Sequence, residues 1–457
     1  MWPIMFGLLL CLATSSVATI TIVDPSDYAD LSADAADNSL TADWDYSPLS
    51  YQEIAITGPY YYNDSQTTLG HETLTASGND TSVLVITEDS DVDVSYTTII
   101  KYGYSTDLYQ SSFYGVNAAV NVANASIASF DHVNVTSHNG AASIYGYGND
   151  TYVYVNNSDL YSSGPLSHGL YAAGYGTIIG RNVRHYSGAY RSSSYAGDSP
   201  KGYIYVYDSE SHTAGLGSAV FYAQGIIHAE HVIGYTENAP VLFVDGATVS
   251  ISHSDLTAGL LAGMVTFSSG TRQSGSTINL IDTRLTVLPE TAAGLWFGNV
   301  IATSTLTGVE INTTSGVLVA ANYSQVTQAF DHLAGYEANS DLEPAEATLD
   351  VYESSLSGDL VAYNGSSISW SLYSYSSWTG AAYSGYGTSY FAVLLDKTSS
   401  WTLTADTTLQ NFTNSVTNLS NIDSAGYNIY YDSSSSANKW LNNATISLSG
   451  GGSISPI

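Results

Sequence analysis

Residues 142–160 read ASIYGYGNDTYVYVNNSDL, and units built in the same way begin at His168, Arg191, Ser218 and Pro240. Each unit joins small residues around one aromatic side chain, a glycine, and a strand in which apolar and polar residues alternate. The strands end in related phrases, namely NNSDL, YDSES, SHSDL, IDTRL and YESSL. The aromatic residues lie 26, 24, 27 and 21 positions apart, at Tyr145, Tyr171, Tyr195, Tyr222 and Phe243.

A unit of this kind cannot bury one of its faces alone, so it must stack on a neighbour. Stacking pairs each short strand in parallel with its equivalent one unit later. In the strand 203–207, Ile204 and Val206 suit an interior, whereas the three tyrosines suit an outer surface. We therefore predict an all-β fold, a single-stranded right-handed parallel β-helix of roughly 13 coils and ~60 Å. A β-propeller or β-sandwich is the competing fold, but neither predicts coils of varying length.

Four segments are expected along the chain. Residues 1–18 (MWPIMFGLLLCLATSSVA) hold an apolar run and a small-residue cleavage pattern typical of a secretory signal peptide. Residues 19–80 are Asp-rich and are expected to form an N-terminal cap, and residues 81–400 the β-helix. Residues 401–457 are expected to form a C-terminal cap and tail, because open end coils would expose unpaired strand edges.

Two resemblances accompany this pattern. The repeated units over roughly residues 80–400 resemble in architecture the pectate-lyase-like superfamily of right-handed β-helices. The phrase SWTLTADT at residues 400–407 is similar to the closing repeats of autotransporter-type adhesin stems. The first resemblance implies a solenoid related to polysaccharide-cleaving enzymes, and the second implies adhesion. Neither determines an activity, because fold does not imply function.

Composition excludes several classes of partner. The chain of 457 residues carries 9 basic and 41 acidic residues, a formal net charge of −32. Such a charge opposes binding to nucleic acid and to anionic membrane surfaces, and is compatible with weak Ca²⁺ binding at most. No stretch after residue 18 has the length of an apolar transmembrane helix, so no membrane insertion is expected. The single cysteine, Cys11, lies in the signal peptide, so the mature chain is expected to lack disulfides.

Asn-x-Ser/Thr sequences are expected glycosylation sites in an exported protein. Together with the signal peptide they indicate a glycosylated eukaryotic product that is extracellular, in or near a cell wall or cell surface. The twelve sites are Asn63, Asn79, Asn124, Asn134, Asn149, Asn156, Asn312, Asn322, Asn364, Asn411, Asn418 and Asn443.

The motifs of β-helical polysaccharide-cleaving enzymes are missing. The hydrolases of the superfamily that the chain resembles carry NTD, DD, GHG and RIK phrases, whose carboxylates protonate the leaving oxygen and activate water. Ser167-His168-Gly169 is the nearest approach to GHG, and no RIK follows it. The lyases require Asp ligands for Ca²⁺, an Arg base and a WiDH phrase, and that phrase is missing too. No G-x-S-x-G nucleophile elbow occurs. The sequence therefore favours a protein without catalytic activity.

Three of the nine basic residues fall within RNVRHYSGAYR, residues 181–191. If successive coils stack, Arg184 lies between Asp159 and Glu210 in a ladder of charges. Arg181 lies instead in an outward row with tyrosines on the same strand face. Aromatic rings stack on the C–H faces of sugars and a guanidinium grips hydroxyls or a carboxylate, although strand propensity alone also explains outward tyrosines. The candidate ligand-binding residues are Arg181, Tyr152, Tyr154, Tyr203, Tyr205 and Tyr207, with Arg191 and Asp198 on the adjoining corner.

Eight of the ten histidines lie between His132 and His253, including the sequence His228-Ala-Glu-His231. Side chains three positions apart in a strand point to opposite faces, so these two histidines are not expected to share an ion. We therefore expect no metal site and no cofactor.

Three functions remain open. The favoured one is non-catalytic, adhesin-like binding of a polysaccharide or cell-surface glycan. The alternative is a divergent polysaccharide lyase or glycoside hydrolase acting on acidic polysaccharide, with a groove near residues 150–210 and Arg184 or Arg191 as base. The third is a purely structural rod, which predicts no cleft. Ligand identity and oligomeric state do not follow from the sequence.

Overall fold

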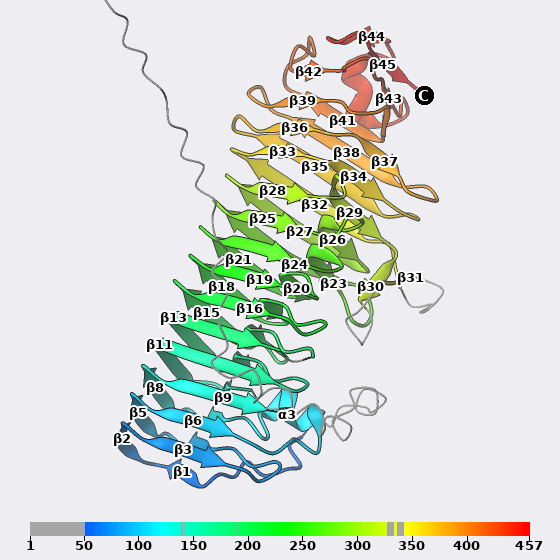
Figure 1. Cartoon of the computed structure of the whole chain (residues 1–457). Helices are drawn as coiled ribbons and strands as arrows, with labels where there is room; N and C mark the ends of the chain where they lie inside the picture. Colours follow the sequence, from blue (N-terminus) through cyan, green and yellow to red (C-terminus); the bar gives the residue numbers. More distant parts are fainter. Residues whose placement is uncertain (1–50, 139, 141, 189, 327–332, 336–341) are drawn as a thin grey trace, which may run out of the picture.

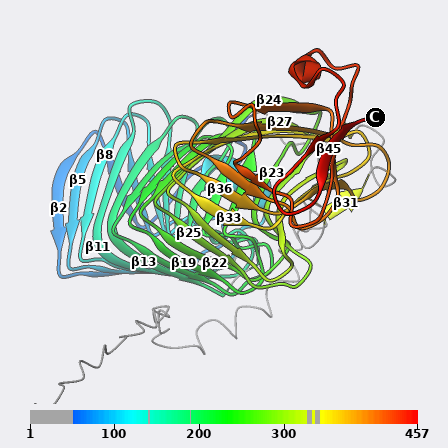
Figure 2. The same cartoon turned by 90° about the horizontal axis from the view of Figure 1, so that it is seen from above.

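The computed structural model describes residues 51–457, apart from residues 139, 141, 189, 327–332 and 336–341. The predicted signal peptide lies outside the described residues, as does the first part of the predicted N-terminal cap. The described chain forms a right-handed parallel β-helix, with coils stacked from β1 (Tyr60–Asn63) to β45 (Ser453–Pro456), as Figure 1 shows. Seen along the stack, successive coils overlie one another with a gradual lateral drift (Figure 2). The predicted fold class is confirmed.

The first sheet holds 13 parallel strands, each from a different coil. They are β1, β4 (Leu84–Thr87), β7 (Val120–Ala123), β10 (Ile144–Tyr147), β12 (Leu170–Ala173), β14 (Tyr195–Gly197), β17 (Phe221–Ala223), β20 (Leu242–Asp245), β23 (Ala262–Phe267), β26 (Ala293–Gly298), β29 (Val317–Asn322), β34 (Asp359–Ala362) and β37 (Ala382–Ser384).

The second sheet follows the first in each coil and is also parallel. Its strands are β2 (Gln66–Gly70), β5 (Asp91–Ser95), β8 (Ile127–Asp131), β11 (Tyr152–Ser163), β13 (Thr177–Ser187), β15 (Tyr203–Tyr207), β18 (Ile226–Glu230), β21 (Thr248–Ser252), β24 (Gln273–Ile281), β27 (Val300–Thr307), β32 (Glu346–Tyr352), β35 (Ser367–Tyr373), β38 (Tyr390–Leu395) and β41 (Asn411–Asn414).

The third sheet closes each coil, and the long strands β11 and β13 run on into it. Its other strands are β3 (Thr73–Ala76), β6 (Thr98–Lys101), β9 (Asn134–His138), β16 (Glu210–Thr213), β19 (Ile233–Thr236), β22 (Asp255–Ala258), β25 (Arg284–Val287) and β28 (Glu310–Thr313), followed by β33 (Ser355–Ser357), β36 (Ser377–Thr379), β39 (Ser400–Thr402) and β42 (Ile422–Asp423). The elements outside the three sheets are α3 (Leu108–Tyr114), β30 (Ser324–Val326), β31 (Leu333–Gly335), β40 (Thr407–Leu409), β43 (Ile429–Tyr431), η4 (Ser436–Leu441), β44 (Ile446–Ser447) and β45.

The register of the first sheet confirms most of the predicted aromatic row and corrects one member. Tyr145 pairs with Tyr171, and their rings meet edge to face at 5.1 Å. Tyr195, however, pairs with Leu170, so that Ala196 takes the place beside Tyr171. One residue of slip moves a side chain to the opposite face of a strand. Tyr195 accordingly lies in the interior against Phe221, whereas Tyr145 and Tyr171 face outward.

Apolar side chains from all three sheets fill the interior of the coils and are almost completely buried. The strand β15 shows the pattern: Ile204 and Val206 are fully buried, as predicted, and the flanking tyrosines are partly exposed. Toward the C-terminus the rings of Trp378 and Trp401 stack at 4.7 Å inside the rod. Burial of such side chains stabilises each by about 1.5–3 kcal/mol, so the interior columns replace disulfides as the source of stability.

The outward face of the first sheet is also covered. Tyr145, Tyr171 and Phe243 are buried although they point away from the interior. Helix α3 and strand β30 project on one flank of the stack (Figure 1) and help to cover this face. The helix begins where the Asp107 carboxylate accepts hydrogen bonds from the N–H groups of Tyr109 and Gln110. Loops therefore build a second layer over the strands of the first sheet.

One residue forms the corner between the second and third sheets, in the left-handed conformation with φ of 45–60° in ten coils. The next residue is Ser or Thr in six of these coils and Val in three. In one example the N–H of Val183 donates to the Ser209 Oγ of the following coil at 3.0 Å, and that hydroxyl donates to Tyr207 O at 2.7 Å. The recurring phrases of the sequence are therefore these corners. The corner column comprises His71, Tyr96, His132, Asn157, Asn182, Asp208, His231, His253, Asp282 and Glu353.

The coils extend beyond the predicted range 81–400 at both ends. Within the predicted cap of residues 19–80, strands β1, β2 and β3 pair in parallel with β4, β5 and β6 as a complete coil. After residue 400, β40, β43 and β45 continue the parallel stacking. The described helices are all too short, or too polar, to cross a bilayer.

Candidate functional site

A cavity of about 210 Å³ lies outside the first sheet, beneath its covering loops. Its walls come from coils that are far apart in the sequence, with α3 and β30 at its margin. The lining residues are Tyr109, Ser112, Phe113, Leu166, His168, Tyr171, Arg191, Ser193, Asp198, Gly217, Tyr222, Gln224, Asp245, Phe267, Ser269 and Val326. The purely structural hypothesis predicted no cleft, whereas the described residues form this cavity.

The register that turns Tyr195 inward accounts for the position of the cavity. In the outward row of the first sheet, Ala196 lies between Tyr171 and Tyr222, which both line the cavity. Neighbouring coils carry aromatic rings at this position, so the methyl group of Ala196 leaves space between two tyrosine rings.

Asp198 is the most strongly perturbed acid of the site and is only 6% exposed. Its Oδ2 accepts a hydrogen bond from the Tyr171 hydroxyl at 2.5 Å, and its Oδ1 accepts one from the N–H of Ser199 at 2.7 Å. Burial, assisted by the charge of Asp245, raises the pKa of Asp198 to about 6, against these hydrogen bonds and the charge of Arg191. The carboxyl group therefore changes its charge in mildly acidic solution.

Asp245 is the second carboxyl group of the cavity. The pairing of β14, β17 and β20 places Asp198, Gln224 and Asp245 at equivalent positions on three successive coils. Gln224 Nε2 donates to Asp245 Oδ2 at 3.3 Å, and the N–H of Ser269 donates to Asp245 Oδ1 at 3.0 Å. Burial raises the pKa of Asp245, and the bonds from Ser269 oppose the shift. Two carboxyl groups thus face one cavity with an amide between them.

Arg191 supplies the positive charge of the site. It is 7% exposed, and burial lowers the pKa of its guanidinium to about 10, opposed by nearby tyrosines and by Asp198. The group therefore remains protonated at neutral pH. A buried guanidinium suits the binding of hydroxyl or carboxylate oxygens, not the removal of a proton. The hypothesis that Arg191 is a catalytic base is not supported by this environment.

His168 lies beside the tyrosine wall. Its Nδ1 accepts a hydrogen bond from the N–H of Ser193 at 2.9 Å, and its ring lies 4.4 Å from that of Tyr171. Burial lowers the pKa of His168 to about 3, so the ring is neutral at pH 7 and its Nε2 carries the proton. His168 is therefore a neutral hydrogen-bonding group of the cavity wall.

The structure separates the predicted ligand-binding residues into two places. Arg191 and Asp198 line the cavity, whereas Arg181 and the tyrosines of β11 and β15 lie on the second sheet. Thr177 pairs with both Tyr152 and Tyr203, and Ile179 pairs with both Tyr154 and Tyr205. The tyrosines are thus divided by one intervening strand and do not form a continuous aromatic platform.

Arg181 already has partners on this face. Its Nη1 lies 3.0 Å from Asp208 Oδ2, and its guanidinium lies over the Tyr207 ring at 4.8 Å. It also pairs in register with Asn156, one of the predicted glycosylation sites. A glycan on Asn156 would lie directly beside Arg181 and restrict access to it. None of the twelve predicted glycosylation asparagines is buried in the described structure.

Arg184 lies in the predicted charge ladder. Its Nε and Nη2 donate to the two carboxylate oxygens of Asp159, and the charge of Glu210 acts from the following coil. Hydrogen bonding to Asp159 raises the pKa of Arg184. This pairing explains the residue as part of the scaffold and makes it unsuitable as a catalytic base.

Sequence reasoning missed Asp245, Gln224 and Tyr222, which complete the cavity. The sequence did contain a signal for these residues. Asp198, Gln224 and Asp245 occupy the same position, at the end of the short first-sheet strand, in three consecutive units. Comparison with models of known protein families and with curated proteins finds no match to the chain. The resemblances described above therefore rest on architecture and on a short phrase.

Proposed function

We propose that the chain is an exported β-helical protein that binds carbohydrate, without cleaving it, in the cavity of the first sheet. One observation carries the proposal: Arg191, Asp198 and Asp245 line a single cavity together with the rings of Tyr171 and Tyr222. Charged and amide side chains orient sugar hydroxyls, and aromatic rings contact the C–H faces of the sugar. The protonated Arg191 favours a sugar that bears a carboxylate.

The size of the cavity limits the ligand. Cavities for drug-sized molecules measure about 300–1,000 Å³, and this one measures about 210 Å³. It suits one sugar residue, held at the end of a chain or as a side branch. The proposed partner is therefore a polysaccharide or cell-surface glycan with exposed single residues, and the proposed location is extracellular, on a cell wall or cell surface.

A second candidate function is hydrolysis of the bound sugar, favoured by the two carboxyl groups. Asp198 and Asp245 occupy equivalent positions two coils apart, which separates their backbones by about 10 Å. Inverting glycosidases hold their two carboxyl groups about 6.5–9.5 Å apart. Asp198, with a pKa of about 6, would act as the acid in mildly acidic solution, and Asp245 would activate the water.

Glycan-array binding and a sugar-release assay separate the two candidates. The purified full-length protein would be applied to neutral and acidic glycans, and positive ligands would then be incubated with it and assayed for reducing ends and unsaturated products. Binding without release supports the first function, and release that Asp245→Asn abolishes supports the second.

Matched arginine variants localise the site. Arg191→Gln should lose binding, whereas Arg184→Gln, on the exposed charge ladder, should retain it. Circular dichroism of both variants establishes that they are folded. Equal binding by the two folded variants would place the glycan site elsewhere and reject the cavity.

A further inference from the structure

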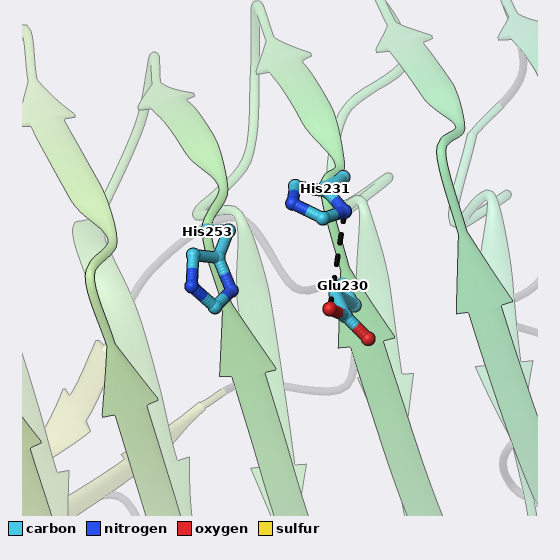
Figure 3. Close-up of side chains that lie close together, drawn as sticks. All are labelled: Glu230, His231 and His253. Carbon is cyan, nitrogen blue, oxygen red and sulfur yellow. Dashed lines mark ion pairs between the residues drawn. The ribbon is translucent and has the colours of Figure 1, made fainter.

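The corner column brings two histidines from successive coils into contact. His231 and His253 occupy the corners after β18 and β21, and their ring centroids are 5.1 Å apart. Glu230, the last residue of β18, points to the same place, as Figure 3 shows. One ligand atom from each of Glu230, His231 and His253 lies within 4.8 Å of the others. This is the single cluster of its kind among the residues that the structure describes.

The backbone explains why these side chains meet. His231 and His253 have φ of 54° and 50°, and such left-handed corners direct successive side chains outward in one line along the rod. Two coils earlier in the column, Asn182 Nδ2 donates to Asn157 Oδ1 at 2.9 Å, so neighbouring corner side chains touch there as well. Where the column carries amides the contact is a hydrogen bond. Where it carries two imidazoles and a carboxylate, the same spacing assembles metal ligands.

The donor set has a definite chemistry. Two imidazole nitrogens and one carboxylate oxygen form a common ligand set for Zn²⁺, each at about 2.0–2.2 Å, with a fourth position left for water or a substrate atom. Bound ligand atoms in a tetrahedron lie within about 3.5 Å of one another, so these side chains need only small rotations from their present positions. The histidine side chains are 54% and 46% exposed, which leaves them free to make this adjustment.

Carboxylates flank the cluster on both sides along the column. Asp208 Oδ1 lies 3.4 Å from His231 Nδ1, and Asp282 Oδ2 lies 3.5 Å from His253 Nε2. A carboxylate next to a ligating imidazole orients the ring and raises its basicity. The negative field of a chain with net charge −32 also favours a divalent cation at its surface.

We propose that Glu230, His231 and His253 form a surface site for a divalent transition-metal ion of the Zn²⁺ class, independent of the carbohydrate cavity. The prediction that His228 and His231 do not share an ion is compatible with it. His228 lies 6.3 and 5.9 Å from the rings of Tyr205 and Tyr207. The partner of His231 is instead 22 positions away in sequence and one coil away in space.

Calorimetric titration of ZnCl₂ into untagged, metal-stripped full-length protein tests the site, with the visible absorption of added Co²⁺ as a second readout. We expect saturable binding of one ion per chain and Co²⁺ bands typical of four-coordination. His231→Asn and His253→Asn should each weaken binding at least ~100-fold, because loss of even an outer-shell partner weakens metal sites by about 10–100-fold. Glu230→Gln should weaken it in the same direction.

Asn is the right replacement because it already occupies the corner at positions 157 and 182. The matched control is His132→Asn, at a corner whose histidine stacks on Tyr96 and pairs with Asp131. It should bind Zn²⁺ like the parent protein. Absence of saturable binding in the parent, or undiminished affinity in both His231→Asn and His253→Asn, would overturn the proposal.

Discussion

The Arg184 guanidinium of one coil holds the Asp159 carboxylate of the previous coil through two hydrogen bonds, of 2.6 and 2.7 Å. This pair accounts for one member of the basic cluster at residues 181–191, and the other two have different environments. Arg181 pairs with Asp208 at the surface, whereas Arg191 is buried in the wall of the cavity. The cluster in sequence is therefore not a cluster in space, since one coil distributes its residues over three sheets.

Arg181→Ala is expected to leave the stability nearly unchanged and to weaken binding of any acidic sugar at the second sheet. The side chain is 57% exposed and its ion pair with Asp208 lies at the surface. Exposed pairs of this kind contribute about 0.2–1 kcal/mol. Chemical unfolding measures the stability, and titration with an acidic oligosaccharide measures the affinity. A loss of several kcal/mol would make Arg181 a scaffold residue.

Removal of the predicted glycosylation site at Asn156 provides a companion measurement for Arg181. If Asn156 carries a glycan, that glycan lies beside the guanidinium and limits its contacts. Asn156→Gln should then raise the affinity for the acidic oligosaccharide relative to the glycosylated parent. Identical affinities in a glycosylated preparation would exclude a ligand contact at this face.

Gly225→Ala is expected to destabilise the protein by about 1–3 kcal/mol, the range for overpacked interiors. A Cβ at this position would lie 2.0 Å from Gly202 O of the previous coil, which has no side chain to move aside. Gly270→Ala is the control, because a Cβ there meets nothing within 4 Å. Urea unfolding of both variants gives the comparison, and equal stabilities would show that the coil spacing relaxes without cost.

Much of the fold could be predicted from the sequence because a parallel solenoid repeats its contacts. The spacing of Thr177 after Tyr152 and of Arg184 after Asp159 correctly gave their pairing. The spacing between Tyr171 and Tyr195 did not, because the connecting loop places Leu170 opposite Tyr195. Both residues are tyrosines, so their identity does not show which face of the strand each side chain occupies. A shift of one residue in the pairing turns the side chain to the opposite face.

The candidate site was less accessible to sequence reasoning for a physical reason. Asp198 and Asp245 line the same cavity from coils on either side of an intervening coil, and Tyr109 joins its wall from helix α3. Such contacts depend on the path of loops that do not repeat. The cluster of Glu230, His231 and His253 does not follow from sequence for a related reason, because His231 and His253 lie 22 positions apart and meet only where their corners stack.

Ser209→Ala is expected to cost about 1–3 kcal/mol, the penalty for a buried donor without an acceptor. The Ser209 side chain accepts from the buried N–H of Val183, and this residue is 1% exposed. Ser209→Thr should be close to neutral, because Thr97 and Thr283 occupy equivalent corners and keep the same hydroxyl. Thermal and urea unfolding of the Ser209→Ala and Ser209→Thr variants distinguishes the effect of losing the hydroxyl from the effect of changing the size of the side chain.

Asp198→Asn is expected to change the dependence of stability on pH. The pKa of Asp198 in the folded protein is about 6, above its ordinary value of 3.8. A carboxyl group whose pKa is raised by folding binds its proton more tightly in the folded state. Its favourable contribution is therefore complete below pH 3.8 and is lost as the pH rises through 6.

At pH 7 this ionisation costs the parent protein about 3 kcal/mol relative to acidic solution, at about 1.4 kcal/mol for each pKa unit. The variant cannot ionise, so its stability minus that of the parent should rise by about 2 kcal/mol between pH 4 and pH 7, since part of the loss occurs below pH 4. Measuring the difference across pH cancels any constant effect of losing the bond from Ser199 to Asp198 Oδ1. Asp159→Asn, at a partly exposed position of the charge ladder, is the control and should show no such rise. A difference that stays flat from pH 4 to pH 7 would mean that the cavity is wetter, and its carboxyl groups less perturbed, than the geometry implies.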